Sequence, residues 1–152
     1  MHYYQYDAEN LLTDVFSSSD SITGEHEAHY TYYKHGLLAR TLLGGNQVQG
    51  LDYAYTLQGW LKSINGNALS PTADMGQDGS SANQNTQYIG RDAYGFSLHY
   101  FEGDYSSITH ASLFNGLKQQ LGTAYKPLYN GNIKHGSEHR SVEQPAAIQL
   151  YL

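Results

Sequence analysis

The residue types that most often carry chemistry form no recognisable set in this chain. His26 and His29 stand in the run His-Glu-Ala-His, one residue short of the His-Glu-x-x-His spacing that places two imidazoles on one helix face for zinc. On a strand, residues three apart point to opposite sides of the sheet. We therefore interpret this pair as solvated histidines of a loop or strand rather than as metal ligands.

Two further candidates for a metal site are no stronger. Asp74 and Asp78 resemble the start of a calcium loop, but the alternating Asp/Asn ligands and the closing Glu of that motif are missing. His135 and His139 have the spacing of a helix face, but the glycine and serine after His135 predict a loop. The sequence therefore predicts no metal site and no cofactor.

An enzyme active site cannot be assembled from the sequence either. There is no Gly-x-Ser-x-Gly nucleophile motif, no phosphate-binding Gly-x-x-x-x-Gly-Lys-Ser/Thr loop and no cysteine. The carboxylates of Glu25, Glu27, Glu102 and Asp104 could pair as in a glycosidase, but nothing singles out two of them, and their spacing predicts solvated loops. We predict that the chain is not an enzyme.

Composition points to an all-β fold. The 152 residues include 15 Tyr and 16 Gly with only 14% charged residues, which is typical of many short strands and turns. The formal charge of −6 comes without a run of Lys or Arg, so nucleic acid is not an expected partner. No stretch approaches the roughly 20 apolar residues of a membrane span. The first residues lack the order of a signal peptide, so we expect any export signal elsewhere in a larger protein.

One short phrase occurs three times, and it organises the chain. The pattern Tyr-x-Tyr-x-x-x-(Gly/Asn)-(Leu/Trp)-Leu is defined by Tyr4, Tyr6, Asp7 and Asn10; by Tyr30, Tyr32 and Gly36; and by Tyr53, Tyr55, Gly59 and Trp60. Tyr-x-Tyr places two strand-forming rings on one side of an extended chain. Asn and Gly tolerate the positive φ that a hairpin turn needs. Each copy therefore predicts a strand, a turn and a second strand.

The predicted elements fall into three regions. Three hairpins fill residues 1–69, a polar loop or insertion rich in Gly, Ser and Asn spans 70–91, and residues 92–152 add further strands to the same sheet region. In the last region, the pattern predicts a strand within 92–105, a short helix or loop over 109–121, a strand and turn over 127–133, a polar loop over 134–145 and a closing strand over 147–152.

The repeated phrase resembles the tyrosine-aspartate (YD) repeats of Rhs proteins, most closely the large surface or secreted Rhs-type proteins of Bacteroidetes-like bacteria. The likeness covers most of the chain, with its motifs at 4–12, 45–61, 92–98 and 128–133. The family's aspartate occurs here at Asp7, while Tyr33 and Thr56 hold its place in the other copies. The resemblance implies hairpins paired edge to edge in a curved sheet, part of an extracellular or cell-surface shell that in toxin systems encloses a C-terminal effector.

Two functions remain open. In the first, the chain is a structural segment whose open sheet edges pair with neighbouring repeats or with other copies of the chain. In the second, a face bearing Trp60, Tyr53 and Tyr55 binds carbohydrate or a cell-surface partner. Packing of these rings against one another and against Tyr30 and Tyr32 would favour the structural function, whereas an open groove would favour binding.

Overall fold

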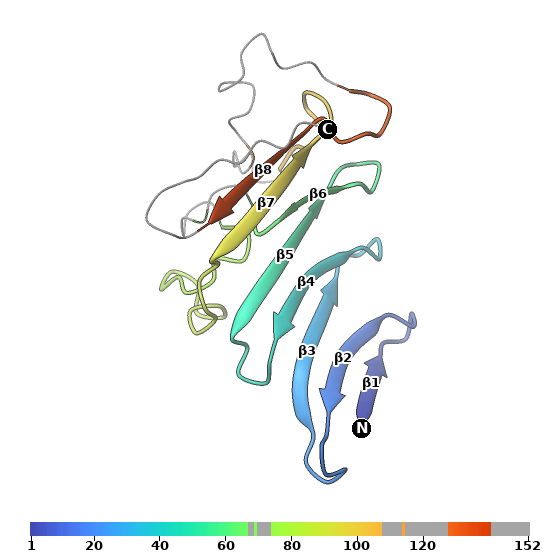
Figure 1. Ribbon diagram of the computed structural model, residues 1–152, viewed down its shortest axis with the longest axis vertical. Helices are drawn as coiled ribbons and strands as arrows, with labels where there is room; N and C mark the ends of the chain where they lie inside the picture. The colour runs from blue at the N-terminus through green and yellow to red at the C-terminus, as the bar shows by residue number, and fades with distance from the viewer. Residues whose placement is uncertain (67–68, 70–73, 108–113, 115–127, 141–152) are drawn as a thin grey trace.

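The fold is one open antiparallel β-sheet whose eight strands follow one another in sequence order (Figure 1). The structure, a computed structural model, describes residues 1–66, 69, 74–107, 114 and 128–140. The strands are β1 (His2–Tyr6), β2 (Leu12–Ser17), β3 (Glu25–Tyr32), β4 (Leu38–Leu43), β5 (Gln49–Tyr55), β6 (Leu61–Ile64), β7 (Tyr94–His99) and β8 (His135–Arg140). No helix occurs among the described residues, so the all-β prediction is confirmed.

The pairs β1–β2, β3–β4 and β5–β6 are three hairpins of the same construction, and we call them the three hairpin units. In each unit the residue after the second tyrosine donates its N–H to the carbonyl four residues later, from Asp7 to Leu11, from Tyr33 to Leu37 and from Thr56 to Trp60. The register also slips by one residue at the same place in all three units.

The residue that closes each turn has the backbone conformation that the sequence predicts. Asn10, Gly36 and Gly59 have φ angles of 62°, 85° and 81°. Each also donates its N–H to the carbonyl three residues earlier, which fixes the turn. Since β-carbon clashes make this region costly for most residues, the repeat needs Gly or Asn at this position.

The C-terminal part of the sheet corrects two predictions. β8 lies within the segment predicted as a polar loop, and residues 128–133, predicted as a strand and turn, form no strand. The β8 sequence His-Gly-Ser-Glu-His-Arg has little intrinsic strand preference, but all six residues pair with β7. Tertiary pairing therefore decides its conformation. The predicted helix over 109–121, apart from residue 114, and the predicted strand over 147–152 lie outside the described residues.

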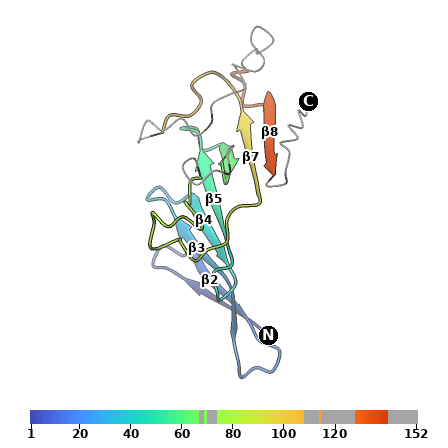
Figure 2. The same ribbon diagram turned by 90° about the vertical axis from the view of Figure 1, so that its left-hand side faces the viewer.

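The sheet buries little apolar surface among the described residues. Ala28, Ala54, Ile89 and Tyr100 are the buried apolar residues there, whereas buried polar and charged residues are more numerous. The polar segment 74–91 packs beside β4 and β5 (Figure 2), where the Gly90 N–H donates to the Val48 carbonyl. Polar contacts therefore carry much of the packing on this face.

Candidate functional site

In the first and third hairpin units, the side chain at the aspartate position of the repeat accepts a hydrogen bond within the turn. The Asp7 Oδ1 accepts the N–H groups of Glu9 at 3.0 Å and Leu11 at 2.8 Å. In the third unit Thr56 Oγ1 accepts the Trp60 N–H at 3.2 Å, which is the bond equivalent to that between Leu11 and Asp7. A threonine can therefore supply the acceptor oxygen that the aspartate supplies in the first unit. In the second unit Tyr33 holds this position and donates its hydroxyl to the Tyr53 carbonyl, and the turn keeps its backbone hydrogen bonds.

Tyrosine hydroxyls connect one hairpin unit to the next. Tyr32 donates to the Leu12 carbonyl of the first unit, and Tyr33 donates to the Tyr53 carbonyl of the third, both at 2.7 Å. The Tyr33 ring also lies edge-on to the Tyr55 ring, with centroids 6.3 Å apart. Since a hydrogen bond of this kind contributes on the order of 1 kcal/mol, the repeat tyrosines stabilise the contact between units.

Trp60, the residue most suited to stack on a sugar, is half-buried and packs against other residues. Its ring lies 5.1 Å from the ring of Tyr100, and the backbone of Gly131 approaches so closely that a β-carbon there would be 3.1 Å from the indole. Tyr100 in turn donates its hydroxyl to the Leu61 carbonyl at 2.8 Å. Trp60 is therefore packed between β6 and the segments that flank β7 and β8.

The remaining residues of the repeat pattern lie at different depths. Tyr30, Tyr32, Tyr53, Tyr55 and Trp60 are half-buried, whereas Tyr4, Tyr6, Asn10, Gly36 and Gly59 are exposed. The exposed tyrosines belong to β1, which has one strand neighbour. Among the tyrosines of the repeat pattern, the exposed rings therefore lie on an edge strand rather than on the central strands.

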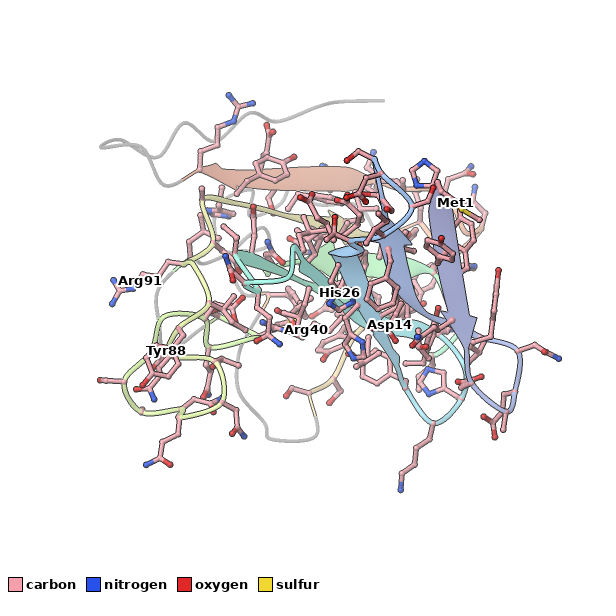
Figure 3. All side chains as sticks on the ribbon, turned by 90° about the horizontal axis from the view of Figure 1, so that it is seen from below. Met1, Asp14, His26, Arg40, Tyr88 and Arg91 are labelled. Carbon is pink, nitrogen blue, oxygen red and sulfur yellow. The ribbon has the colours of Figure 1, made fainter. Side chains whose placement is uncertain are left out.

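His26 and His29 correct the prediction that they point to opposite sides. Both rings reach the same oxygen of Asp14 on β2, His26 through Nε2 at 2.9 Å and His29 through Nδ1 at 2.8 Å. Figure 3 shows His26 beside Asp14. Phe16 pairs with His26 and Val15 with Ala28, so Glu27 is an extra residue in β3. This β-bulge shifts the alternation by one position and places both imidazoles on the Asp14 face.

A second cluster surrounds Arg40 on the face covered by segment 74–91. The guanidinium binds Asp52 on β5 and Asp78 in that segment. Gly50 and Gly76 leave the space that it occupies, because a β-carbon at either position would overlap it. Arg40 therefore anchors segment 74–91 to the sheet.

The carboxylates of this cluster are hard to ionise. Burial raises the pKa of Asp52 to about 6 against the opposing charge of Arg40. Burial, together with the carboxylates of Asp74 and Asp78, raises the pKa of Asp92 to about 8. Asp74 accepts the N–H groups of Gly76 and Asp78. The side chains proposed for a calcium loop are thus used for a backbone turn and an ion pair.

A third cluster centres on Lys62, which is 1% exposed. Its ammonium group donates to both oxygens of Asp104, at 2.9 and 3.0 Å, and to Nδ1 of His99 at 3.2 Å. The prediction that Asp104 lies in a solvated loop is wrong, since its carboxylate is buried against Lys62. His99 can accept this bond because burial and the charge of Lys62 lower its pKa to about 4.

The Lys62 cluster extends to two serines on β7 and β8. Ser97 contacts Nε2 of His99 at 3.1 Å and Ser137 Oγ at 2.7 Å. Ser97 is completely buried, with no exposed surface. These hydrogen bonds join β6, β7 and β8.

Asp14, Arg40 and Lys62 are the central residues that the sequence analysis missed. Arg40 and Lys62 each stand in the middle of an apolar strand pattern, as in Leu-Ala-Arg-Thr-Leu. A charged side chain in such a place needs a buried partner, so these two positions could have been used to predict buried ion pairs. Nothing in the sequence marks the bulge at Glu27 that brings Asp14 to the two histidines.

Comparison with models of protein families, with curated proteins and with solved structures found no match. In the part of the chain that the structure describes, no helix is long and apolar enough to cross a membrane. The fold itself defines an all-β protein built on a single antiparallel meander, in which three hairpin units share one turn geometry.

Proposed function

We propose that this chain is a wall segment of an Rhs-type YD-repeat protein. The observation that carries the proposal is that three hairpin units with the same turn hydrogen bonds and the same register slip lie side by side in one open sheet. Such a sheet extends by adding further hairpins at its edge. In toxin systems of the family the extended sheet encloses a C-terminal effector, and that role outside the cell is part of the proposal.

The bonds between the hairpin units support a structural function over carbohydrate binding. Trp60 is packed against Tyr100, and Tyr55 lies against Tyr33. The Tyr53 carbonyl is also occupied, by the Tyr33 hydroxyl. Two of the three aromatic rings proposed to bind a sugar, those of Trp60 and Tyr55, thus pack against other rings of the protein.

The small apolar core supports the same proposal. Large apolar side chains are exposed, among them Tyr4 at 55%, Tyr6 at 59%, Val48 at 65% and Ile22 at 87%. A single sheet with exposed apolar groups gains stability when another layer or strand covers them. Neighbouring repeats would supply that cover.

The backbone groups available for pairing at the β1 edge can be assigned. Met1 and Ser18 exchange both of their backbone hydrogen bonds. Such pairs alternate along an antiparallel ladder, so Tyr3 with Phe16 is the next one and Tyr4 with Val15 is not. The N–H and carbonyl of Tyr4 therefore point away from β2, towards any added strand.

The experiment is the solution mass of the purified chain by size exclusion with light scattering, beside far-ultraviolet circular dichroism. We expect β-rich oligomers whose mass rises with protein concentration. Tyr4→Pro should abolish this association, because proline removes the outward N–H and leaves the bonds to β2 intact. Tyr4→Ala is the matched control, since it removes the ring but keeps the N–H.

The outcome that would contradict the proposal is a compact β-rich monomer at all concentrations. Association abolished equally by Tyr4→Ala and Tyr4→Pro would show that rings rather than backbone groups join the chains, and edge pairing by β1 would be excluded.

A further inference from the structure

Three metal-ligating side chains meet on one face of β2 and β3. The nearest ligand atoms of Asp14, His26 and His29 all lie within 4.8 Å of one another. In a tetrahedral zinc site with bonds of about 2.0–2.1 Å, ligand atoms are ~3.3 Å apart. Small side-chain movements would therefore bring all three donors to one ion.

The bulge holds the two histidines on the Asp14 face. The carbonyl of the extra residue, Glu27, accepts the Gly44 N–H at 2.7 Å, and its carboxylate accepts the Ser17 hydroxyl. The Phe16 ring stacks on the His26 ring at 4.6 Å with an interplanar angle of 22°. The backbone and one imidazole are thus held in place by contacts outside the cluster, as in sites where a bulge re-aims a side chain.

The cluster is open to ions and carries the charge to attract them. The side chains of His26 and His29 are 30% and 38% exposed, and that of Asp14 is 16% exposed. The Asp14 carboxylate faces two ring nitrogens, Nε2 of His26 at 2.9 Å and Nδ1 of His29 at 2.8 Å.

The structure assigns to Asp14, His26 and His29 a binding site for a divalent transition-metal ion of the zinc type. Two imidazoles and one carboxylate suit zinc and its neighbours rather than calcium or magnesium, which prefer oxygen ligands alone. Each neutral imidazole would bind the ion through the nitrogen that faces Asp14 and would carry its proton on the other ring nitrogen, and water would fill the remaining coordination position. It would link the first hairpin unit to the second, because Asp14 lies on β2 and both histidines lie on β3.

The chain offers a matched control in His35. This histidine follows β3, is exposed and stacks on Tyr33 with centroids 5.3 Å apart. His35 is close in sequence to the two histidines of β3 but lies outside the cluster. His35→Gln therefore has the same chemistry of substitution as His26→Gln and His29→Gln.

The test is calorimetric titration of the full chain, cleared of metal with a chelator, with Zn²⁺ at pH 7.5. We expect one ion per chain, no binding of Mg²⁺, and at least a tenfold loss of Zn²⁺ affinity in His26→Gln, His29→Gln and Asp14→Asn. His35→Gln should bind as the wild type does. Absence of saturable Zn²⁺ binding, or binding that these three substitutions leave unchanged, would overturn the inference.

A second measurement follows the metal in the unaltered chain, so it does not depend on how the three variants of the cluster fold. Zn²⁺ should shift the side-chain ¹⁵N resonances of two histidines, with His26 coordinating through Nε2 and His29 through Nδ1. The spectrum of His35→Gln identifies the His35 signals, which should stay in place. Shifts confined to other histidines would overturn the assignment.

Discussion

Buried ion pairs hold this sheet and its covering segments together, a role that apolar side chains have in most sheets. Lys62 and Asp104 are 1% and 8% exposed, and Arg40 binds two buried aspartates. Removing one partner of such a pair leaves the other charge buried without compensation, whereas replacing both with apolar groups is often nearly neutral. The clusters are therefore sensitive to single substitutions.

For Asp104→Ala we expect a loss of about 3–5 kcal/mol in the free energy of unfolding, because the Lys62 ammonium loses its carboxylate. Urea denaturation followed by circular dichroism measures it. The double substitution Lys62→Met with Asp104→Leu should lose less than Asp104→Ala, and Glu25→Ala, at an exposed position, should change little. Equal losses in the single and the double variant would contradict this account.

Asp92 predicts an unusual dependence of stability on pH. Its pKa is raised from 3.8 to about 8 in the fold, so the folded state holds a proton that the unfolded chain releases. The contribution of Asp92 is therefore favourable below pH 3.8 and is lost as the pH rises towards 8.

For Asp92→Asn we expect a flatter stability profile over that interval, because the amide cannot ionise. At pH 8 the free energy of unfolding of the variant should exceed that of the wild type by at least ~1.4 kcal/mol, which corresponds to a shift of one pKa unit. Urea denaturation at a series of pH values tests this, with Glu9→Gln as the exposed control. Parallel profiles for wild type and Asp92→Asn would show that Asp92 ionises normally.

At the scale of elements, the hairpin turn is the part that the sequence predicts best. Spacing located all three turns and the residues with positive φ, because these depend on local backbone sterics. The bulge at Glu27 and the strand β8 were not predicted, since both depend on partners distant in the sequence. The same limit applies to the site: His26 and His29 were visible in the sequence, but their meeting with Asp14 was not.

The turn geometry predicts the effect of Gly36→Ala. With φ at 85°, a β-carbon costs about 1–2 kcal/mol, and thermal unfolding should show the corresponding loss. Gly24→Ala is the control, because Gly24 lies outside the positive-φ region and nothing lies within 4 Å of its added β-carbon. An equal effect at both positions would mean that the loss is not due to φ.

At the scale of the whole molecule, the two outer strands of the described sheet decide how the chain meets its neighbours. β1 and β8 each pair with one strand there, and β1 is exposed along its whole length. The association proposed for this edge uses backbone hydrogen bonds, so it should depend weakly on salt, unlike association through charged side chains. Light scattering at low and high ionic strength distinguishes the two.

The strictly consecutive order of the strands also bears on how the protein is made. Each strand pairs with the strand synthesised just before it, so a hairpin can dock as soon as it leaves the ribosome, onto a template that is already in place. The connections from β6 to β7 and from β7 to β8 are long. Pairing of β7 and of β8 should therefore be the slower steps, because a longer segment must be synthesised and its ends brought together first. Among the strands that the structure describes, the order of synthesis and the order in the sheet are the same, so none of them must insert between two strands that formed earlier.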